Sequence, residues 1–295
     1  MIGKITVKRG IKRAAGLASV AISPLATLPP GTACILMYHR IAPIDFVDNR
    51  ADDWNVTVQV FARHMRTLAD MADPVPLHAL GARLARPTSS MRPVVCVTVD
   101  DGYASALRTA LPVLMEYGIP ATFFVPTAYV GSREPMPFDR WGALNRGRVT
   151  SETWLATDWD ELEQAVATDL VTVGSHSHHH FEARDCSAGQ LAEEAQRSRE
   201  HLRARLGSNH ARAYAYPYGS SRRGDVTWPY EAAVRAAGYE LAVTTDVGLA
   251  LATGNRFRLP RVEALQLDSP RVLSAKIRGS LTPFWLTDWV RDRIH

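Results

Sequence analysis

Two acidic side chains and a pair of histidines are the residues of this chain whose types and spacing suit catalysis. Asp100 and Asp101 directly follow the apolar run Val94–Val99. His176 and His180 stand four positions apart, so one helical turn or a tight loop would bring both rings to one side. Two imidazoles and one carboxylate with an open fourth position form the ligand set of a catalytic zinc site. One aspartate would then bind the metal, and the other would take a proton from a metal-bound water, whose pKa falls to about 7.

Each signal also has a structural interpretation. Asp100 can cap the helix that follows, with Asp101 solvated, because turn and cap residues are common after strands. Surface histidine clusters are common as well, and His178 and His179 are neighbours with no required role. However, a buried strand has no structural use for two carboxylates, which are costly away from water. Acids and histidines together favour the metal site.

These residues follow apolar runs that read as buried strands, separated mostly by helical patterns. Alternating strands and helices predict a parallel sheet with right-handed crossovers. A long segment at 131–150, rich in Gly, Pro and Arg, is expected to be a loop. The expected strands are Ala33–Tyr38, Val94–Val99, Ala121–Val125, Leu170–Val173, Ala213–Tyr216, Leu241–Thr245 and Phe257–Leu259, and the expected helices are Phe61–Met71, Ser105–Tyr117, Asp158–Ala167, Ala188–Leu206 and Tyr230–Ala237.

Polar residues stand at the carboxyl end of nearly every expected strand. An open doubly wound sheet would concentrate such residues at one switch point, whereas contributions from all strands indicate a barrel with its site on one face. The sequence therefore predicts an α/β fold, an irregular seven-stranded (β/α) barrel. The strand-end residues are His39, Asp100, Asp101, Thr127, His176, Tyr218, Asp246 and Arg261.

Composition and charge limit the function classes. The chain has 295 residues, 46% hydrophobic and 22% charged, which is ample for a sizeable core. Three widely spaced cysteines imply no disulfide framework. The net charge is +4, yet the first thirteen residues alone carry five basic side chains and no acid, so the remainder is about −1. The body of the protein is therefore not a basic nucleic-acid surface, and no nucleic-acid partner is expected.

The two ends have their own expectations. Residues 1–30 combine the basic charges with a weakly apolar run that is too short and interrupted to span a bilayer. A basic amphipathic helix on an anionic membrane surface is preferred, with a disordered tail or a cleaved export signal as alternatives. Residues 281–295 are amphipathic and aromatic-rich, which predicts a helix packed on the barrel or a second membrane contact.

Several motifs resemble those of the carbohydrate esterase family 4, or NodB-homology, polysaccharide deacetylases. Thr98-Val-Asp-Asp-Gly102 looks like the first motif of that family, T-F-D-D-G, and His176-Ser-His-His-His180 matches the second, H-S/T-x-x-H. Ala215-Tyr-Pro-Tyr-Gly219 resembles the third, R-x-P-Y-G. Leu36-Met-Tyr-His-Arg-Ile41 and Ile119-Pro-Ala-Thr-Phe-Phe-Val125 also look like this family. The resemblance covers roughly residues 33–262 and implies a NodB-homology type barrel domain over residues 31–280.

Carried over by position, the resemblance implies Asp100 as catalytic base. Asp101, His176 and His180 would hold the metal. The backbone N–H of Tyr218, together with the metal, would stabilise the oxyanion formed as water attacks an acetamide carbonyl.

The chain departs from the family pattern at two places. Ala215 stands where the family has an arginine that orients the base, and no late Leu-x-His supplies the general acid. Other strand ends are expected to supply both groups. His39 closes the first strand, and Arg261 closes the last, its neighbour in a closed barrel. We expect His39 to protonate the leaving amine and Arg261 to replace the missing arginine, each with a hydrogen-bonded structural residue as the alternative.

The resemblance implies a metal-dependent enzyme that removes N-acetyl groups from an acetylamino sugar in a bacterial glycan. An O-acetyl glycan esterase and a catalytically silent carbohydrate-binding protein are the alternatives. Zn²⁺ is the expected ion, and Co²⁺ or Ni²⁺ suits the same ligands. The expected partner is an acetylated oligo- or polysaccharide, with a lipid-linked form among the candidates. The expected location is the cytoplasm, with peripheral contact to the inner membrane through residues 1–30, or export as the alternative.

Overall fold

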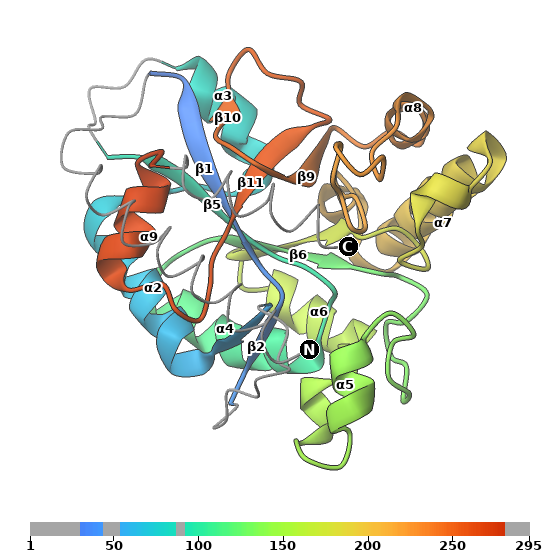
Figure 1. Ribbon diagram of the computed structural model, residues 1–295, viewed down its shortest axis with the longest axis horizontal. Helices are drawn as coiled ribbons and strands as arrows, with labels where there is room; N and C mark the ends of the chain where they lie inside the picture. Colours follow the sequence, from blue (N-terminus) through green and yellow to red (C-terminus); the bar gives the residue numbers. More distant parts are fainter. Residues whose placement is uncertain (1–29, 44–53, 87–91, 281–295) are drawn as a thin grey trace, which may run out of the picture.

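Seven parallel strands form a closed barrel in the computed structural model, which describes residues 30–43, 54–86 and 92–280. Neighbouring strands of the barrel follow one another along the chain, and the first pairs with both the second and the last. Figure 1 shows this ring with helices outside it, which confirms the predicted (β/α) barrel. Its strands are β1 (Thr32–Tyr38), β5 (Val94–Val99), β6 (Ala121–Val125), β7 (Val171–Ser175), β8 (Ala213–Ala215), β9 (Leu241–Val247) and β11 (Leu259–Glu263).

Four short strands lie outside this ring. β10 (Ala250–Leu251) pairs antiparallel with β1, and β4 (Asp73–Pro74) pairs parallel with β5. β2 (Arg40–Ala42) pairs parallel with β3 (Asn55–Thr57). Because β2 begins one residue after His39, this second sheet fixes the chain where it leaves the carboxyl end of the barrel.

The helices cover the outside of the barrel, and side chains in the flanking sequence cap several of them. Asp158 and Ser187 each complete a capping box at a helix start, and Gly118 ends a helix in the left-handed conformation. Within the described ranges, every helix is too short or too polar to cross a bilayer. The α-helices are α2 (Val58–Met71), α3 (Leu80–Ala85), α4 (Ala104–Tyr117), α5 (Arg140–Asn145), α6 (Trp159–Val166), α7 (Ala188–Leu206), α8 (Trp228–Ala236) and α9 (Pro270–Ile277), with 3-10 turns η2 (Leu77–Ala79), η3 (Ser151–Thr153), η4 (Ala183–Asp185) and η5 (Ser208–His210).

Alternation along the strands divides the buried side chains into an inner and an outer set. The outer set packs against α2 and α4, while the inner set fills the barrel. Extending the inward series past the apolar layer brings His39, Asp100 and Arg261 to the inside of the carboxyl end. The inner residues include Ala33, Ile35, Val94, Cys96, Phe124, Ala213, Ala215, Leu241, Val243 and Leu259.

Two details of the expected element pattern are wrong. The last strand runs Leu259–Glu263, so Arg261 lies within it and does not follow its end. The pairing of β11 with β9 changes register between Leu259 and Arg261, and this irregularity accommodates Pro260, which has no N–H to donate. The segment 131–150 is not only a loop, because it contains α5, whose N-cap is Asp139.

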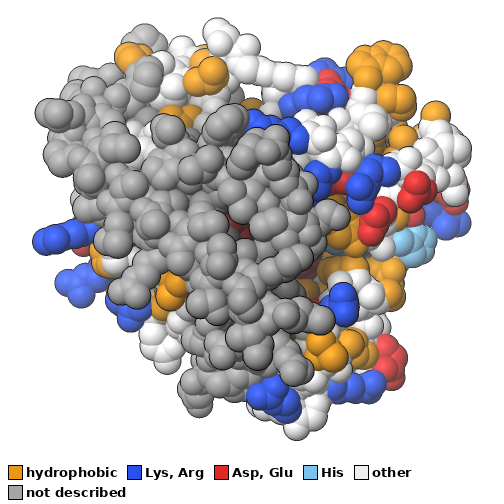
Figure 2. Space-filling view, viewed as in Figure 1, with side chains coloured by type: hydrophobic (Ala, Val, Ile, Leu, Met, Phe, Trp, Pro, Cys, Tyr) orange, Lys and Arg blue, Asp and Glu red, His pale blue; other side chains and the backbone are white. Residues whose placement is uncertain are grey.

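The expected segments at 1–30 and 281–295 lie outside the described residues, apart from Pro30. Between them, the described residues form the barrel with its surrounding helices. On the face shown in Figure 2, the Lys and Arg side chains that are drawn are interspersed with Asp and Glu. This mixture agrees with the near-neutral charge of the body of the chain.

Replacing Glu231 of α8 with glutamine is expected to lower stability in a pH-dependent way. Burial raises the pKa of Glu231, but hydrogen bonds from Arg258, Asn255 and Arg235 outweigh it and lower the pKa to about 2. Stability from the ionised carboxylate is therefore fully present above pH 4.5, its ordinary pKa, and is lost as pH falls towards 2.

At pH 7 the variant should lose about 1–2 kcal/mol, after allowance for screening at the partly exposed arginines. Urea unfolding at pH 7 and pH 3 measures this difference. An equal loss at both pH values would contradict the assignment of the stabilising effect to the ionised form of Glu231.

Candidate active site

Asp100 is a fully buried carboxylate held by one arginine. Arg261 donates from Nη1 to Oδ1 at 2.8 Å and from Nη2 to Oδ2 at 2.7 Å. Its Nε donates to the carbonyl of Thr244 at 2.8 Å, and Nη1 also reaches Thr98 Oγ1 at 3.1 Å, so the guanidinium is fixed on both sides. Burial raises the pKa of Asp100, but Arg261 and His176 outweigh it and hold the pKa below its ordinary value. The carboxylate is therefore ionised and able to accept a proton.

His39 lies beside this carboxylate, immediately after β1. Its Nε2 is 3.9 Å from Asp100 Oδ2, and its ring packs against Trp54 with centroids 4.3 Å apart. Burial lowers the pKa of His39, although Asp101 and Asp100 both favour the protonated ring. An imidazole at this position can exchange a proton with a substrate group bound next to Asp100.

Asp101, His176 and His180 converge on one point. Oδ1 of Asp101 is 3.4 Å from Nε2 of each histidine, and the three ligand atoms all lie within 4.8 Å of one another. Donors at tetrahedral zinc distances lie about 3.4 Å apart, so this spacing fits a divalent ion. His176 Nδ1 lies 2.8 Å from the carbonyl of Ala215, to which it donates, leaving the Nε2 lone pair directed to the ligand cluster.

Two of the three residues favour the charge state that binds a metal. Burial raises the pKa of Asp101, but hydrogen bonds from His176 and His180 outweigh it and place the pKa well below its ordinary value. Burial lowers the pKa of His180, whereas Asp101 and Asp100 overcome burial at His176 and raise its pKa. The Asp101 carboxylate therefore favours the ionised form and His180 the neutral ring, whereas His176 must lose its Nε2 proton when it binds a metal.

The backbone is strained where these side chains are presented. Asp101, Ser177, His180 and Tyr218 all have positive φ angles, of 72°, 60°, 52° and 59°. Each left-handed non-glycine residue costs about 1–2 kcal/mol, and such strain gathers at functional sites. Ser177 offsets part of it, because its Oγ accepts the N–H of His180 at 2.8 Å.

Tyr218 lies in a tight turn after β8. Its carbonyl accepts from Thr245 Oγ1 at 2.7 Å, and no described residue accepts from its N–H. Gly219 is needed next, because its φ is 58° and a Cβ there would lie 2.8 Å from the carbonyl oxygen of Tyr216. The ring of Tyr218 contacts that of His180, with centroids 5.0 Å apart. The residue whose ring contacts the ligand cluster thus has a backbone N–H that no described residue occupies.

The structure brings the sequence-predicted site residues to one end of the barrel. Asp246, another of the predicted strand-end residues, contacts the turn after Tyr218, where its carboxylate accepts the N–H of Ser221 at 3.1 Å. The residues brought together are Asp100, Asp101, His176, His180, His39 and Arg261, with Tyr218 at the edge.

Sequence reasoning missed two residues that contact the site, Phe138 and Trp54, and a third, Arg40, that contacts the segment carrying Phe138. Phe138 stacks on His180 with centroids 3.7 Å apart and planes at 19°, and Trp54 packs on His39. Arg40, next to His39, is buried between the segment that carries Phe138 and the strand ends. Its position one residue after a candidate catalytic histidine is the signal that was available. Phe138 has no such signal.

Comparison with known proteins agrees with this geometry. The family model described as polysaccharide deacetylase matches residues 88–242. A Bacillus subtilis (strain 168) protein assigned as a polysaccharide deacetylase, YxkH, is 24% identical over 81% of this chain and 73% of its own length.

Solved structures share the fold. The Streptococcus pyogenes deacetylase PplD, in complex with acetate, has a TM-score of 0.69 at 21% identity, covering 84% of this chain and 99% of its own. A de-N-acetylase from Aggregatibacter actinomycetemcomitans has a TM-score of 0.63 at 15% identity, covering 81% and 97%. Since the family model spans more than half of the sequence and includes both the acidic pair and the histidine pair, this chain belongs to the polysaccharide deacetylase family.

Proposed function

We propose that this protein is a metal-dependent hydrolase that removes N-acetyl groups from an acetylamino sugar in a bacterial glycan. The observation that carries the proposal is the trio Asp101, His176 and His180, with 3.4 Å between the carboxylate oxygen and each Nε2, next to the buried Asp100. Two imidazole nitrogens and one carboxylate oxygen suit Zn²⁺ best, and Co²⁺ or Ni²⁺ can bind the same three ligands. When bound, such an ion acidifies water and polarises a carbonyl.

The residues around the trio divide the remaining work. Asp100 takes the proton of the attacking water, and Arg261 keeps its carboxylate ionised and aimed. The backbone N–H of Tyr218 donates to the oxygen that becomes negative as the acetamide carbon turns tetrahedral. His39 then gives a proton to the leaving nitrogen, so that the C–N bond breaks to release acetate and the amine, and the proton that Asp100 took from water replaces the one that His39 gave up.

An amide substrate is favoured over an ester because an amine leaves only after protonation, and His39 lies 3.9 Å from the proton acceptor Asp100. A protein of the same fold is described as a de-N-acetylase, which agrees with this choice. The likeness between the two proteins extends to the fold alone.

The test is a screen for acetate and free amine released from N- and O-acetylated oligosaccharides, with and without chelator. We expect equimolar acetate and amine, abolished by the chelator. Acetate without amine would identify an O-acetyl esterase. No release from any substrate, together with no bound metal, would identify a silent carbohydrate-binding protein on the same fold.

Replacing His39 with alanine is expected to lower kcat/KM for an N-acetyl sugar by about 10²–10³-fold, within the range for a general acid. The loss should be small for p-nitrophenyl acetate, whose leaving group needs no proton. Measuring both substrates separates proton donation from a structural role. Equal losses on both would assign His39 to packing against Trp54, and undiminished deacetylation would remove it from the mechanism.

A further inference from the structure

The two histidines of the ligand trio are held in different ways. His176 donates from Nδ1 to the carbonyl of Ala215, the usual means of fixing the orientation of a ligand ring. His180 is also buried, yet no other described residue offers a hydrogen-bond partner to its Nδ1. On the Nδ1 side, therefore, no hydrogen bond to another described residue fixes the His180 ring.

Phe138 contacts this ring instead. Its ring lies flat against the imidazole of His180, with centroids 3.7 Å apart and planes at 19°. The rings of His176 and Tyr218 meet His180 edge-on, at 4.7 and 5.0 Å. Edge contacts leave the ring free to tilt about its Cβ–Cγ bond, whereas a flat contact over the whole face opposes that rotation.

Phe138 belongs to the segment 131–157 between β6 and α6, which Arg40 holds in place. Arg40 Nη2 donates to Oδ2 of Asp139 at 2.5 Å, and the other carboxylate oxygen of Asp139 caps α5. Arg40 Nε donates to the carbonyl of Thr153 at 2.8 Å, so one guanidinium holds the segment at two points, before α5 and in η3. In Figure 1, α5 lies next to β2, from which Arg40 projects.

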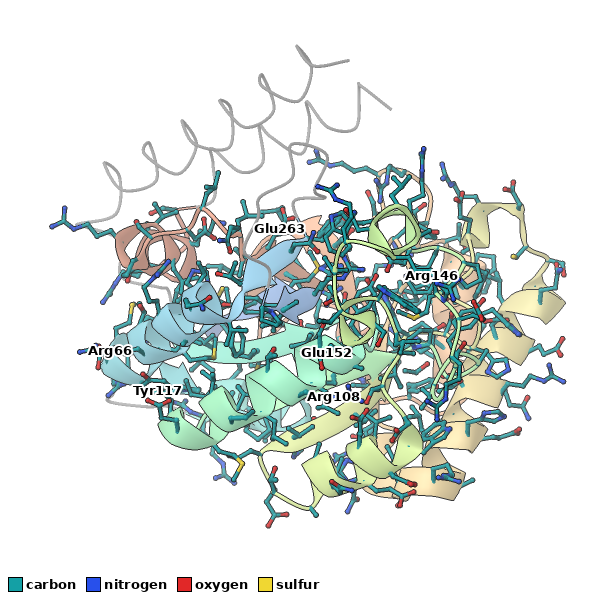
Figure 3. The ribbon with its side chains drawn as sticks, turned by 90° about the horizontal axis from the view of Figure 1, so that it is seen from below. Arg66, Arg108, Tyr117, Arg146, Glu152 and Glu263 are labelled. Carbon is teal, nitrogen blue, oxygen red and sulfur yellow. The ribbon has the colours of Figure 1, made fainter. Side chains whose placement is uncertain are left out.

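Two aromatic rings enclose this guanidinium. Its Cζ is 4.0 Å from the ring centroid of Tyr103, two residues after Asp101, and 4.3 Å from that of Trp141 in α5. On the outer side, Arg108 of α4 pairs with Glu152 of the segment at 3.4 Å, and Figure 3 labels both residues close to one another. The segment is therefore anchored, and Phe138 has a fixed base from which to press on His180.

We propose that Phe138 is a positioning residue for His180 and that Arg40 positions Phe138. The pair takes the place of the missing hydrogen bond on His180 and pre-organises the metal site. This inference rests on the proposed function, because it assigns Phe138 and Arg40 to the metal ligand that the proposed reaction needs. The alternative is that both residues only hold the segment 131–157 together, in which case they affect stability without affecting metal binding.

The experiment measures Zn²⁺ affinity by competition with a chromophoric chelator, independently of turnover. Phe138→Leu keeps an apolar side chain but loses the flat ring, and we expect binding about 10–100-fold weaker, as for loss of an outer contact to a ligand. Phe138→Tyr keeps the ring and should restore near wild-type affinity. Arg40→Met should weaken binding to a similar extent.

The double variant shows whether Arg40 acts through Phe138. If it does, Arg40→Met combined with Phe138→Leu should bind Zn²⁺ no more weakly than the weaker single variant. If the two losses of Zn²⁺ affinity add up in the double variant, Arg40 does not act through Phe138 and the two residues have separate effects.

Glu231→Gln serves as the matched control, since it lowers stability at a site that contains none of the ligand residues. Its Zn²⁺ affinity should equal that of the wild type. If Phe138→Leu is less stable but binds Zn²⁺ as the wild type does, the positioning role is overturned while the proposed function stands. If the wild type binds no Zn²⁺, the proposed function fails and this inference fails with it.

Discussion

Replacing Asp100 with asparagine is expected to slow deacetylation by about 10²–10⁴-fold with Zn²⁺ affinity little changed. The substitution removes the general base, whose effect typically has this size. It keeps the shape of the side chain and one oxygen that accepts from Arg261. In the wild type, Arg261 donates to both carboxylate oxygens, at 2.8 and 2.7 Å. Initial rates of acetate release and chelator competition, measured on the same preparation, check both halves of the expectation.

Because Arg261 is buried opposite Asp100, the Asp100→Asn variant needs a second variant as its control. Without a full negative charge opposite it, Arg261 becomes a buried cation with less compensation, so some stability should also be lost. Arg261→Met with Asp100→Asn removes both charges, and this double variant should recover stability but not activity. Recovery of activity as well would mean that Asp100 acts only by neutralising Arg261, and the role of base would be wrong.

The inner face of the barrel explains why an arginine from β11 can serve Asp100. Ala215 of β8 belongs to the inward apolar layer. Its small side chain leaves space inside the barrel for longer side chains from other strands. Arg261 extends inward from β11 and reaches across to Asp100 at the end of β5. Its Cζ lies 6.0 Å from the ring centroid of Phe124, which belongs to the inner apolar layer. The position of the guanidinium matters more than the strand that supplies it.

Strand order predicted this part of the site only after the family resemblance had pointed to a missing arginine at Ala215. Alternation along the strand before the two acids points the side chain of Asp100 inward. The chain then turns sharply at Asp101, which has a φ of 72°. The barrel closes through the first and last strands, so His39 and Arg261 could be placed near one another before any contact was known. Even so, Arg261 was expected beyond its strand, because Pro260 looked like a strand end.

The segment 131–157 could not be predicted in the same way. It has no long apolar period, and α5 is a helix of only 6 residues, held by tertiary contacts. Asp139 reads as a turn residue, although it caps α5 and also pairs with Arg40, 99 positions earlier. Contacts at such separation leave no local pattern, so Phe138 and its stack on His180 emerge only from the folded chain.

Removing divalent metal is expected to abolish activity and to lower the melting temperature of the wild type, but not that of Asp101→Ala. At a metal concentration 100-fold above Kd, binding stabilises the folded state by about 2.7 kcal/mol. For a domain of this size, that corresponds to roughly 5–10 °C in Tm. Asp101→Ala removes the carboxylate that, among the described residues, lies 3.4 Å from both Nε2 atoms, so Zn²⁺ should neither bind tightly nor shift Tm.

Asp246→Asn is the matched control, because Asp246 is an acid near the carboxyl end of another barrel strand, β9, and its carboxylate bonds to Ser221 and not to the histidines. Its Tm should respond to chelator and to added Zn²⁺ as the wild type does. If Asp101→Ala keeps a wild-type response to Zn²⁺, the ion binds elsewhere, and the short distances between Asp101, His176 and His180 reflect a shared proton instead of a metal site. Thermal melts of the three proteins, each with and without chelator, separate these cases, since only a ligand of the ion can abolish the response.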